Sequence, residues 1–142
     1  MRFIGTVVLF IFGFTLRSQP IGTWREHLPY NSTIDLAAAP DRLFAATPFS
    51  LFSIGKSDGR IVKYSKVDGL SETGIQSIHF DVPTNNLLIA YTNSNLDLLT
   101  PNDRINIPDL KRATGVGDKQ IRSITFFNGK YYLSTEIGRA HV

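Results

Sequence analysis

Two histidines and one glycine-containing loop are the first residues whose types suggest chemistry. His27 and His79 lie in different predicted elements, and neither has a carboxylate at metal-ligand spacing, so both are interpreted as structural residues. Residues 115–119 read Gly-Val-Gly-Asp-Lys. A phosphate-binding loop would need a third glycine, a Ser or Thr after the lysine, and a strand-to-helix context, so this segment is interpreted as a connecting loop.

Hydroxyl and carboxylate side chains give no catalytic pattern either. The serines considered as nucleophiles have no Gly-x-Ser-x-Gly elbow around them; they are Ser32, Ser71 and Ser123. Four carboxylates fall mostly in predicted turns, where turn capping explains them more simply than acid–base catalysis; they are Asp35, Asp41, Asp58 and Asp81. We therefore predict no catalytic residue, no metal site and no cofactor, and expect that the protein is not an enzyme.

A few residues could contact a ligand without catalysis. Trp24 could stack on a sugar, although packing against a face of the fold is the favoured interpretation. Tyr91 and Asn95 flank a predicted hairpin, where they could line a central channel or a rim. The sequon that begins at Asn31 fits a glycosylation site, but a turn before the first strand is favoured. No ligand-binding residue is assigned.

The charge balance excludes one class of partner. The chain has 15 Lys and Arg against 12 Asp and Glu. Removal of Arg2 and Arg17 with the N-terminal segment leaves 13 basic residues. A nearly neutral surface lacks the basic patch of a nucleic-acid-binding protein, so nucleic acid is not expected as a partner.

The N-terminus has the pattern of an export signal. An arginine precedes about fourteen mainly apolar residues, which end at Arg17, as in a secretory signal peptide. A membrane-spanning helix, the alternative, needs roughly 20 apolar residues. We predict a signal peptide over residues 1–18, cleaved near Ser18. Because the chain has no cysteine, it can form neither a disulfide nor a lipid-modified N-terminal Cys.

An internal repeat organises the rest of the chain. Residues 43–51 align without gaps on residues 88–96, at a spacing of 45, and residues 132–135 form a third copy. Upstream, residues 75–80 recur as residues 121–126, with a weaker first copy at 33–36. A period of 43 to 46 residues is typical of one β-propeller blade.

Each repeat unit also has the strands of a blade. Strands are predicted at 75–80, 87–92 and 96–99, and residues 60–64 supply an outer, more polar strand. In the last unit Asn128-Gly129 is a strong hairpin signal. We predict an all-β fold, a partial β-propeller of about two and a half four-stranded blades. A β-sandwich is the alternative, but its strands have no reason to recur in register.

Several motifs carry a family resemblance. Residues 68–71 followed by 75–78 resemble the blade joint of propellers in hybrid two-component regulators. Residues 22–30 (Gly-Thr-Trp-Arg-Glu-His-Leu-Pro-Tyr), 89–99 and 106–112 together resemble the start of the PorZ family of type IX secretion components. The resemblance covers about residues 21–138.

The PorZ resemblance implies a two-propeller surface protein of Bacteroidota-type bacteria. It implies that the protein binds anionic lipopolysaccharide and hands it to the sortase, with other proteins of the outer-membrane attachment complex as partners. The expected location is the cell surface, or the periplasm if the family's C-terminal sorting domain is truly absent. The alternatives are an extracellular sensor of a hybrid two-component regulator, and a lyase or glycosidase propeller.

The C-terminal residues do not continue the repeat. Residues 137–142 stop where another turn and strand are expected, and their literal back-translation matches a sequencing adapter. We therefore expect residues 139–142 to be an artefact and the propeller to be truncated. The predicted domains are the signal peptide, a segment over 19–30 that precedes the first blade, and blades over 31–138.

Overall fold

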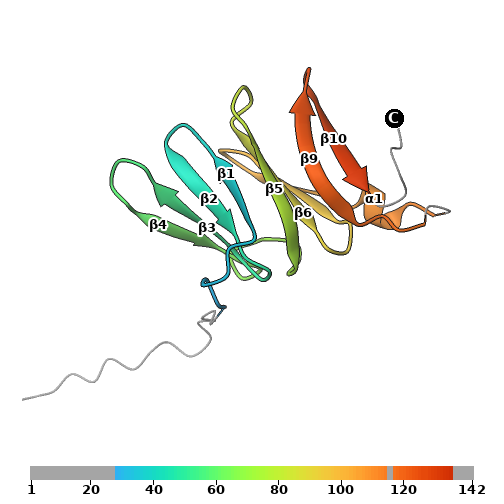
Figure 1. The fold of residues 1–142 in the computed structure, drawn as a ribbon, viewed down its shortest axis with the longest axis horizontal. Coiled ribbons are helices and arrows are strands. Elements are labelled where there is room, and N and C mark those ends of the chain that lie inside the picture. Colours follow the sequence, from blue (N-terminus) through green and yellow to red (C-terminus); the bar gives the residue numbers. More distant parts are fainter. Residues whose placement is uncertain (1–27, 115–116, 136–142) are drawn as a thin grey trace, which may run out of the picture.

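The computed structural model describes residues 28–114 and 117–135, and their regular structure is β-strand except for one short helix. The strands form three antiparallel sheets that lie side by side in chain order (Figure 1). Two sheets have four strands in the orders β1-β2-β3-β4 and β5-β6-β7-β8, and the third pairs β10 with β9. These are two complete propeller blades and the beginning of a third, so the predicted fold class is confirmed.

The blades are named by their position in the chain. The first blade comprises β1 (Asp35–Ala38), β2 (Arg42–Ala46), β3 (Leu51–Gly55) and β4 (Ile61–Tyr64). The second comprises β5 (Ile75–Asp81), β6 (Asn86–Tyr91), β7 (Leu96–Leu99) and β8 (Arg104–Ile107). Helix α1 (Asp109–Arg112) leads into the third blade, which comprises β9 (Ile121–Phe127) and β10 (Lys130–Thr135).

The strands differ from the sequence prediction by one residue at ends of β4, β5 and β6, and more at two further places. The first inner strand was predicted over 33–36, but β1 begins at Asp35, although Ile34 N already donates a hydrogen bond to Ala46 O over 2.8 Å. No elements were predicted for β8 and α1. Most β8 residues are exposed and no α1 residue is buried, so the hydrophobic pattern on which the prediction depended is weak there.

Turn residues with positive φ fix the hairpins. Asn128 and Gly129 have φ values of 48° and 77°, the left-handed pair that a two-residue hairpin of type I′ requires. The predicted Asn-Gly hairpin is therefore confirmed. Asn85 (φ 57°) and Ser94 (φ 65°) adopt the same region at both ends of β6, which fixes where this strand begins and ends.

The hydrophobic core lies between the blades, and β6 contributes to it on both faces. Its Leu87, Ile89 and Tyr91 join one buried cluster with side chains of the first blade. Leu88 and Ala90 join a second cluster with side chains of the third blade. Because both faces are covered, β6 is almost continuously apolar, whereas the outer strands alternate.

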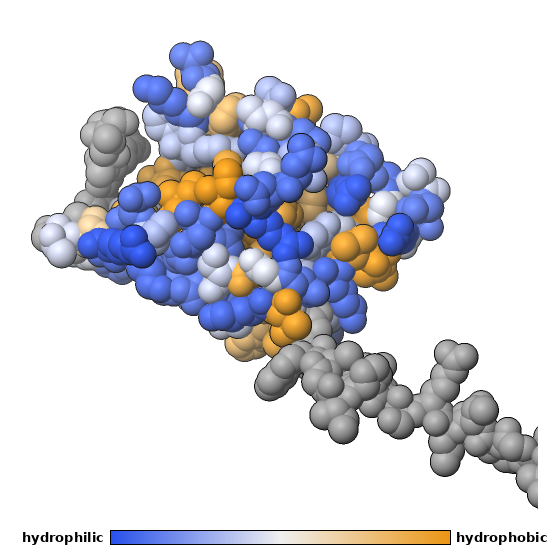
Figure 2. Space-filling model, turned by 180° about the vertical axis from the view of Figure 1, so that it is seen from behind, coloured by the Kyte–Doolittle hydropathy of each residue, from blue (hydrophilic) through white to orange (hydrophobic). Residues whose placement is uncertain are grey.

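The antiparallel order gathers the turns at two ends of the blades. The turns β1–β2, β3–β4, β5–β6 and β7–β8 share one end, and the connections between blades lie at the other (Figure 1). Seen from behind, hydrophobic side chains reach the surface between hydrophilic ones (Figure 2). Among the helices in residues 28–114 and 117–135, none has the length and apolar character needed to cross a bilayer.

Candidate ligand crevice between the first two blades

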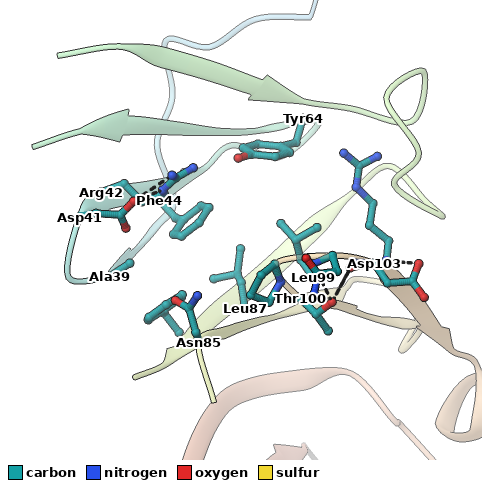
Figure 3. A pocket seen from close by; sticks show the side chains of 14 residues that line it. Ala39, Asp41, Arg42, Phe44, Tyr64, Asn85, Leu87, Leu99, Thr100 and Asp103 are labelled. Carbon is teal, nitrogen blue, oxygen red and sulfur yellow. Dashed lines mark hydrogen bonds and ion pairs between the residues drawn. The ribbon is translucent and has the colours of Figure 1, made fainter. Parts of the chain in front are cut away.

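A crevice of about 620 Å³ opens between the first and second blades. Both of its walls belong to complete four-stranded sheets. Figure 3 shows Asp41, Arg42, Phe44 and Tyr64 on the wall formed by the first blade, and Leu87, Leu99, Thr100 and Asp103 on the wall formed by the second. The volume lies in the range of roughly 300–1,000 Å³ that small-molecule sites occupy.

Two turns carry the polar side chains of the crevice. Lys56, the residue after β3, stabilises the backbone of the β1–β2 turn. Its N donates a hydrogen bond to Asp41 O over 2.9 Å, and its Nζ donates one to Ala39 O over 2.6 Å. In the β7–β8 turn, Thr100 Oγ1 accepts a hydrogen bond from Asp103 N (2.9 Å) and donates one to Asp103 O (3.0 Å). Hydroxyl capping of this kind makes a turn rigid.

Asp41 and Arg42 form an ion pair on the first wall. The Nε and Nη2 atoms of Arg42 donate to Oδ2 of Asp41 over 3.0 and 2.8 Å. The hydrogen bond from Arg42 holds the pKa of Asp41 below its ordinary value, and the same bond raises the pKa of Arg42, with a smaller contribution from Tyr64. Asp41 is therefore ionised at neutral pH, as a hydrogen-bond acceptor and not as a proton donor.

Aromatic rings from both blades form the base of the crevice. Phe44 stacks on Phe80 of the second blade with ring centroids 5.8 Å apart and an interplanar angle of 22°. The ring of Tyr64 also packs against Phe44, with ring centroids 6.3 Å apart. Phe44 is buried, while Phe80 and Tyr64 are half-buried. Such ring pairs stabilise a packed interface beyond the area that they bury.

Arg104 begins β8 at the edge of the second wall. Within the described part of the chain, its guanidinium has neither an ion pair nor a hydrogen bond. Gly69 lies close to it, because a Cβ at that position would be 2.5 Å from Nη1 of Arg104. The absence of a side chain at Gly69, whose φ is 104°, lets the connection between the blades approach this arginine.

The residues that the sequence analysis considered for chemistry do not come together. His79 is half-buried on β5, with its ring 6.4 Å from that of Tyr131. Lys119 donates through Nζ to the backbone oxygens of Lys111 and Ala113. No group of three or more His, Cys, Asp or Glu suited to a metal ion occurs among the described residues. Trp24, His27 and residues 115–116 lie outside them.

The four carboxylates assigned to turns have three different roles. Asp58 accepts a hydrogen bond from Arg60 N over 3.0 Å, and Asp81 accepts one from the hydroxyl of Thr84; both are turn contacts, as predicted. Asp41 forms the ion pair of the crevice. Asp35 instead lies in β1 and accepts hydrogen bonds from β5 of the second blade. The serines also have structural contacts: Ser71 N donates to Asp97, and Ser123 shares a hydrogen bond with Ser134.

Tyr91 and Asn95, for which the sequence left a place at a channel or a rim open, are buried. The Tyr91 hydroxyl donates to Asp97 Oδ2 over 2.6 Å, and Asn95 accepts a hydrogen bond from Asn106 over 3.1 Å. Burial raises the pKa of Tyr91, and the neighbouring Asp97 raises it further. Together with Ser71, these side chains form a polar network inside the second blade that sequence spacing does not reveal.

The sequence analysis missed the crevice, although one signal was present. The pair Asp-Arg occurs at 41–42 and again at 103–104. Each pair ends a turn and begins a strand, β2 in the first blade and β8 in the second. The two pairs lie on facing walls of one crevice. Because the pairs come from different strands of their blades, the 45-residue repeat does not align them.

Comparison with known proteins identifies the family. The model of the PorZ N-terminal β-propeller domain of the type IX secretion system matches residues 43–142. The chain belongs to this family. PorZ-family membership confirms the resemblance that residues 89–99 and 106–112 indicated, and it agrees with the blades of the structure. Residues 22–30 lie outside the matched range.

A solved PorZ structure has the same arrangement of blades. The structure of PorZ from Porphyromonas gingivalis, described as an essential bacterial surface component of the type IX secretion system, matches with a TM-score of 0.68 and 27% sequence identity. The match covers 72% of this PorZ-family chain and 14% of the solved PorZ chain. The chain therefore spans a small part of the length of that relative. No curated protein matches significantly.

Proposed function

We propose that this chain belongs to a non-catalytic, cell-surface propeller of the type IX secretion attachment complex. In this proposal it binds anionic lipopolysaccharide and delivers it to the sortase, which anchors the cargo. The proposal includes export through a signal peptide over residues 1–18, and blades over residues 31–138 that form part of a larger propeller. The observation that carries it is the family match over residues 43–142.

The geometry of the crevice supports binding in preference to catalysis. An acid–base pair needs two titratable groups whose environments push their pKa values apart, so that one keeps its proton. Asp41 has instead a lowered pKa and a fixed partner in Arg42. Half-buried rings beside polar turn residues, on rigid strands, are typical of a small-molecule site.

The function can be tested in a strain from which the gene is deleted. We expect type IX cargo to be secreted without its lipopolysaccharide anchor, and the complete gene to restore anchoring. In vitro, the product of the complete reading frame is expected to retain lipopolysaccharide that carries the anionic polysaccharide and to co-purify with the sortase. Normal anchoring in the deletion strain, together with equal retention of lipopolysaccharide that lacks the anionic chain, would contradict the proposal.

A further inference from the structure

The crevice between the first two blades is lined by residues of these two blades. The first blade supplies one wall and the second blade the other, and each has all four strands. The stacked rings of Phe44 and Phe80 join the walls at the base.

The charged groups of the crevice are two facing Asp-Arg pairs. Asp41 and Arg42 lie on the first wall, and Asp103 and Arg104 on the second. Two carboxylates and two guanidiniums cancel in charge, so the crevice as a whole does not select an anion. Carboxylates accept hydrogen bonds and guanidiniums donate them, which gives both walls both capacities.

A ligand that both donates and accepts hydrogen bonds at neighbouring atoms fits these walls. Each hydroxyl group has one donor hydrogen and two acceptor lone pairs, so a ring of hydroxyls can satisfy an Asp and an Arg together. The C–H face of such a ring can lie on the half-buried rings of Tyr64 and Phe80, where aromatic side chains offer an apolar surface. This combination is the chemistry of a sugar.

We infer that this crevice binds an uncharged, hydroxyl-rich sugar unit of a glycan. The inference rests on the proposed function, because it names the part of the lipopolysaccharide that the crevice holds. Arg42 is already oriented by Asp41 and therefore loses little side-chain entropy on binding. The guanidinium of Arg104 has neither an ion pair nor a hydrogen bond within the described residues, so its N–H groups are available to donate to a sugar hydroxyl.

The test uses the product of the complete reading frame and a panel of short neutral oligosaccharides of glucose, galactose and mannose, each also in a form with one terminal phosphate. Binding is measured by calorimetry at low and physiological salt. At least one neutral oligosaccharide is expected to bind, with little dependence on salt because the interaction is not between net charges. The phosphate is expected to change the affinity by less than about threefold, which is about half of the free energy of a tenfold change.

Two matched substitutions locate the site. Arg104→Gln removes a charge-assisted donor and is expected to weaken binding about tenfold. Arg112→Gln changes an exposed arginine in the last turn of α1, outside the crevice, and is expected to bind as the wild type does. Failure of every neutral oligosaccharide to bind, or wild-type affinity of Arg104→Gln, would overturn the inference.

Lipopolysaccharide binding by the same variants separates this inference from the proposed function. Retention of anionic lipopolysaccharide by Arg104→Gln at wild-type affinity would remove the crevice as its site and leave the proposed function standing. A protein that binds a neutral oligosaccharide through Arg104 but retains no lipopolysaccharide would support the sugar site and contradict the proposed function.

Discussion

The carboxylate of Asp35 accepts a hydrogen bond from the backbone N–H of Ile78 over 2.9 Å, across the boundary between the first and second blades. Its same oxygen, Oδ2, also accepts a hydrogen bond from the Ser77 hydroxyl over 2.8 Å. These contacts join the inner strands β1 and β5, which belong to different sheets and share no ladder of backbone hydrogen bonds. Asp35 therefore acts as a polar contact between two sheets that also meet through apolar side chains and through the hydrogen bond from Ile75 N to Pro48 O (3.1 Å).

Asp35→Ala should destabilise the protein by about 1–3 kcal/mol, because it leaves the Ile78 N–H and the Ser77 hydroxyl without their acceptor. Urea unfolding of the complete reading-frame product, followed by circular dichroism, measures the change. Asp109→Ala is the control, since Asp109 is exposed in the first turn of α1 and should change stability by less than about 0.5 kcal/mol. Equal effects of both substitutions would refute this role.

Tyr91→Phe tests the polar network inside the second blade. The substitution keeps the buried ring and removes the hydroxyl that donates to Asp97 over 2.6 Å. We expect a loss of about 1.5–3 kcal/mol, the range for a hydrogen bond to a charged group. Tyr132→Phe provides the control, because that tyrosine is 47% exposed on β10; thermal unfolding should separate the two variants.

The same network predicts how stability depends on acid. Burial raises the pKa of Asp97, but hydrogen bonds from Ser71, Tyr91 and Asn106 outweigh it and hold the pKa below its ordinary value. A folded-state pKa below the unfolded value of about 3.9 stabilises the protein above that pH, and the contribution is lost as the pH falls through the folded-state pKa.

Tyr91→Phe removes one of these donors, so the pKa of Asp97 in the folded state should rise toward its unfolded value. The variant should therefore unfold at a higher pH than the wild type when acid is added. Unfolding curves in urea at several pH values below about 5 measure this shift. An unchanged acid midpoint, with Tyr132→Phe also unchanged, would show that Asp97 does not depend on the tyrosine.

Phe44→Ala should be among the most damaging single substitutions in the first blade. Phe44 is 5% exposed and packs against Phe80 and Tyr64 at the junction of two blades. Truncation of such a ring costs about 3–5 kcal/mol. Phe49→Ala removes the same ring from a site that is 50% exposed and should cost far less. Comparable unfolding midpoints for the two variants would contradict this assignment.

Gly69→Ala should disturb both the backbone and Arg104. At a φ of 104°, any Cβ is strained, and here it would also lie 2.5 Å from Nη1 of Arg104. Gly59→Ala is the matched control, because Gly59 has a φ of 65° but open space around its Cβ position. We expect Gly59→Ala to cost about 1 kcal/mol and Gly69→Ala to cost more, within the range of about 1–3 kcal/mol for such strain. Chemical denaturation of both variants measures the difference.

The repeat allowed the blades to be predicted because it is local. Strand β7 has the predicted bounds of Leu96–Leu99, and the hairpin at Asn128 and Gly129 forms as expected. Each of these features depends on residues that are close in the sequence, where turn propensity and alternating side chains decide the outcome.

The contacts between blades could not be predicted in the same way. Asp35 reaches Ile78 over 43 residues, and the crevice takes its side chains from turns of two sheets. Such pairings depend on how the sheets pack, which a periodic pattern does not specify. Tyr91 was considered for a channel or a rim because it flanks a predicted hairpin, yet it is buried and its hydroxyl donates to Asp97.

Strand β6 has a consequence for how the blades unfold. It contributes to the hydrophobic clusters on both of its faces, one shared with the first blade and one with the third. A repeat array whose units share little interface can lose one unit at a time, with a separate transition for each. Here the second blade cannot melt without exposing apolar surface on both neighbours. The three blades should therefore behave as one cooperative unit, in which damage to any of them shifts a single transition.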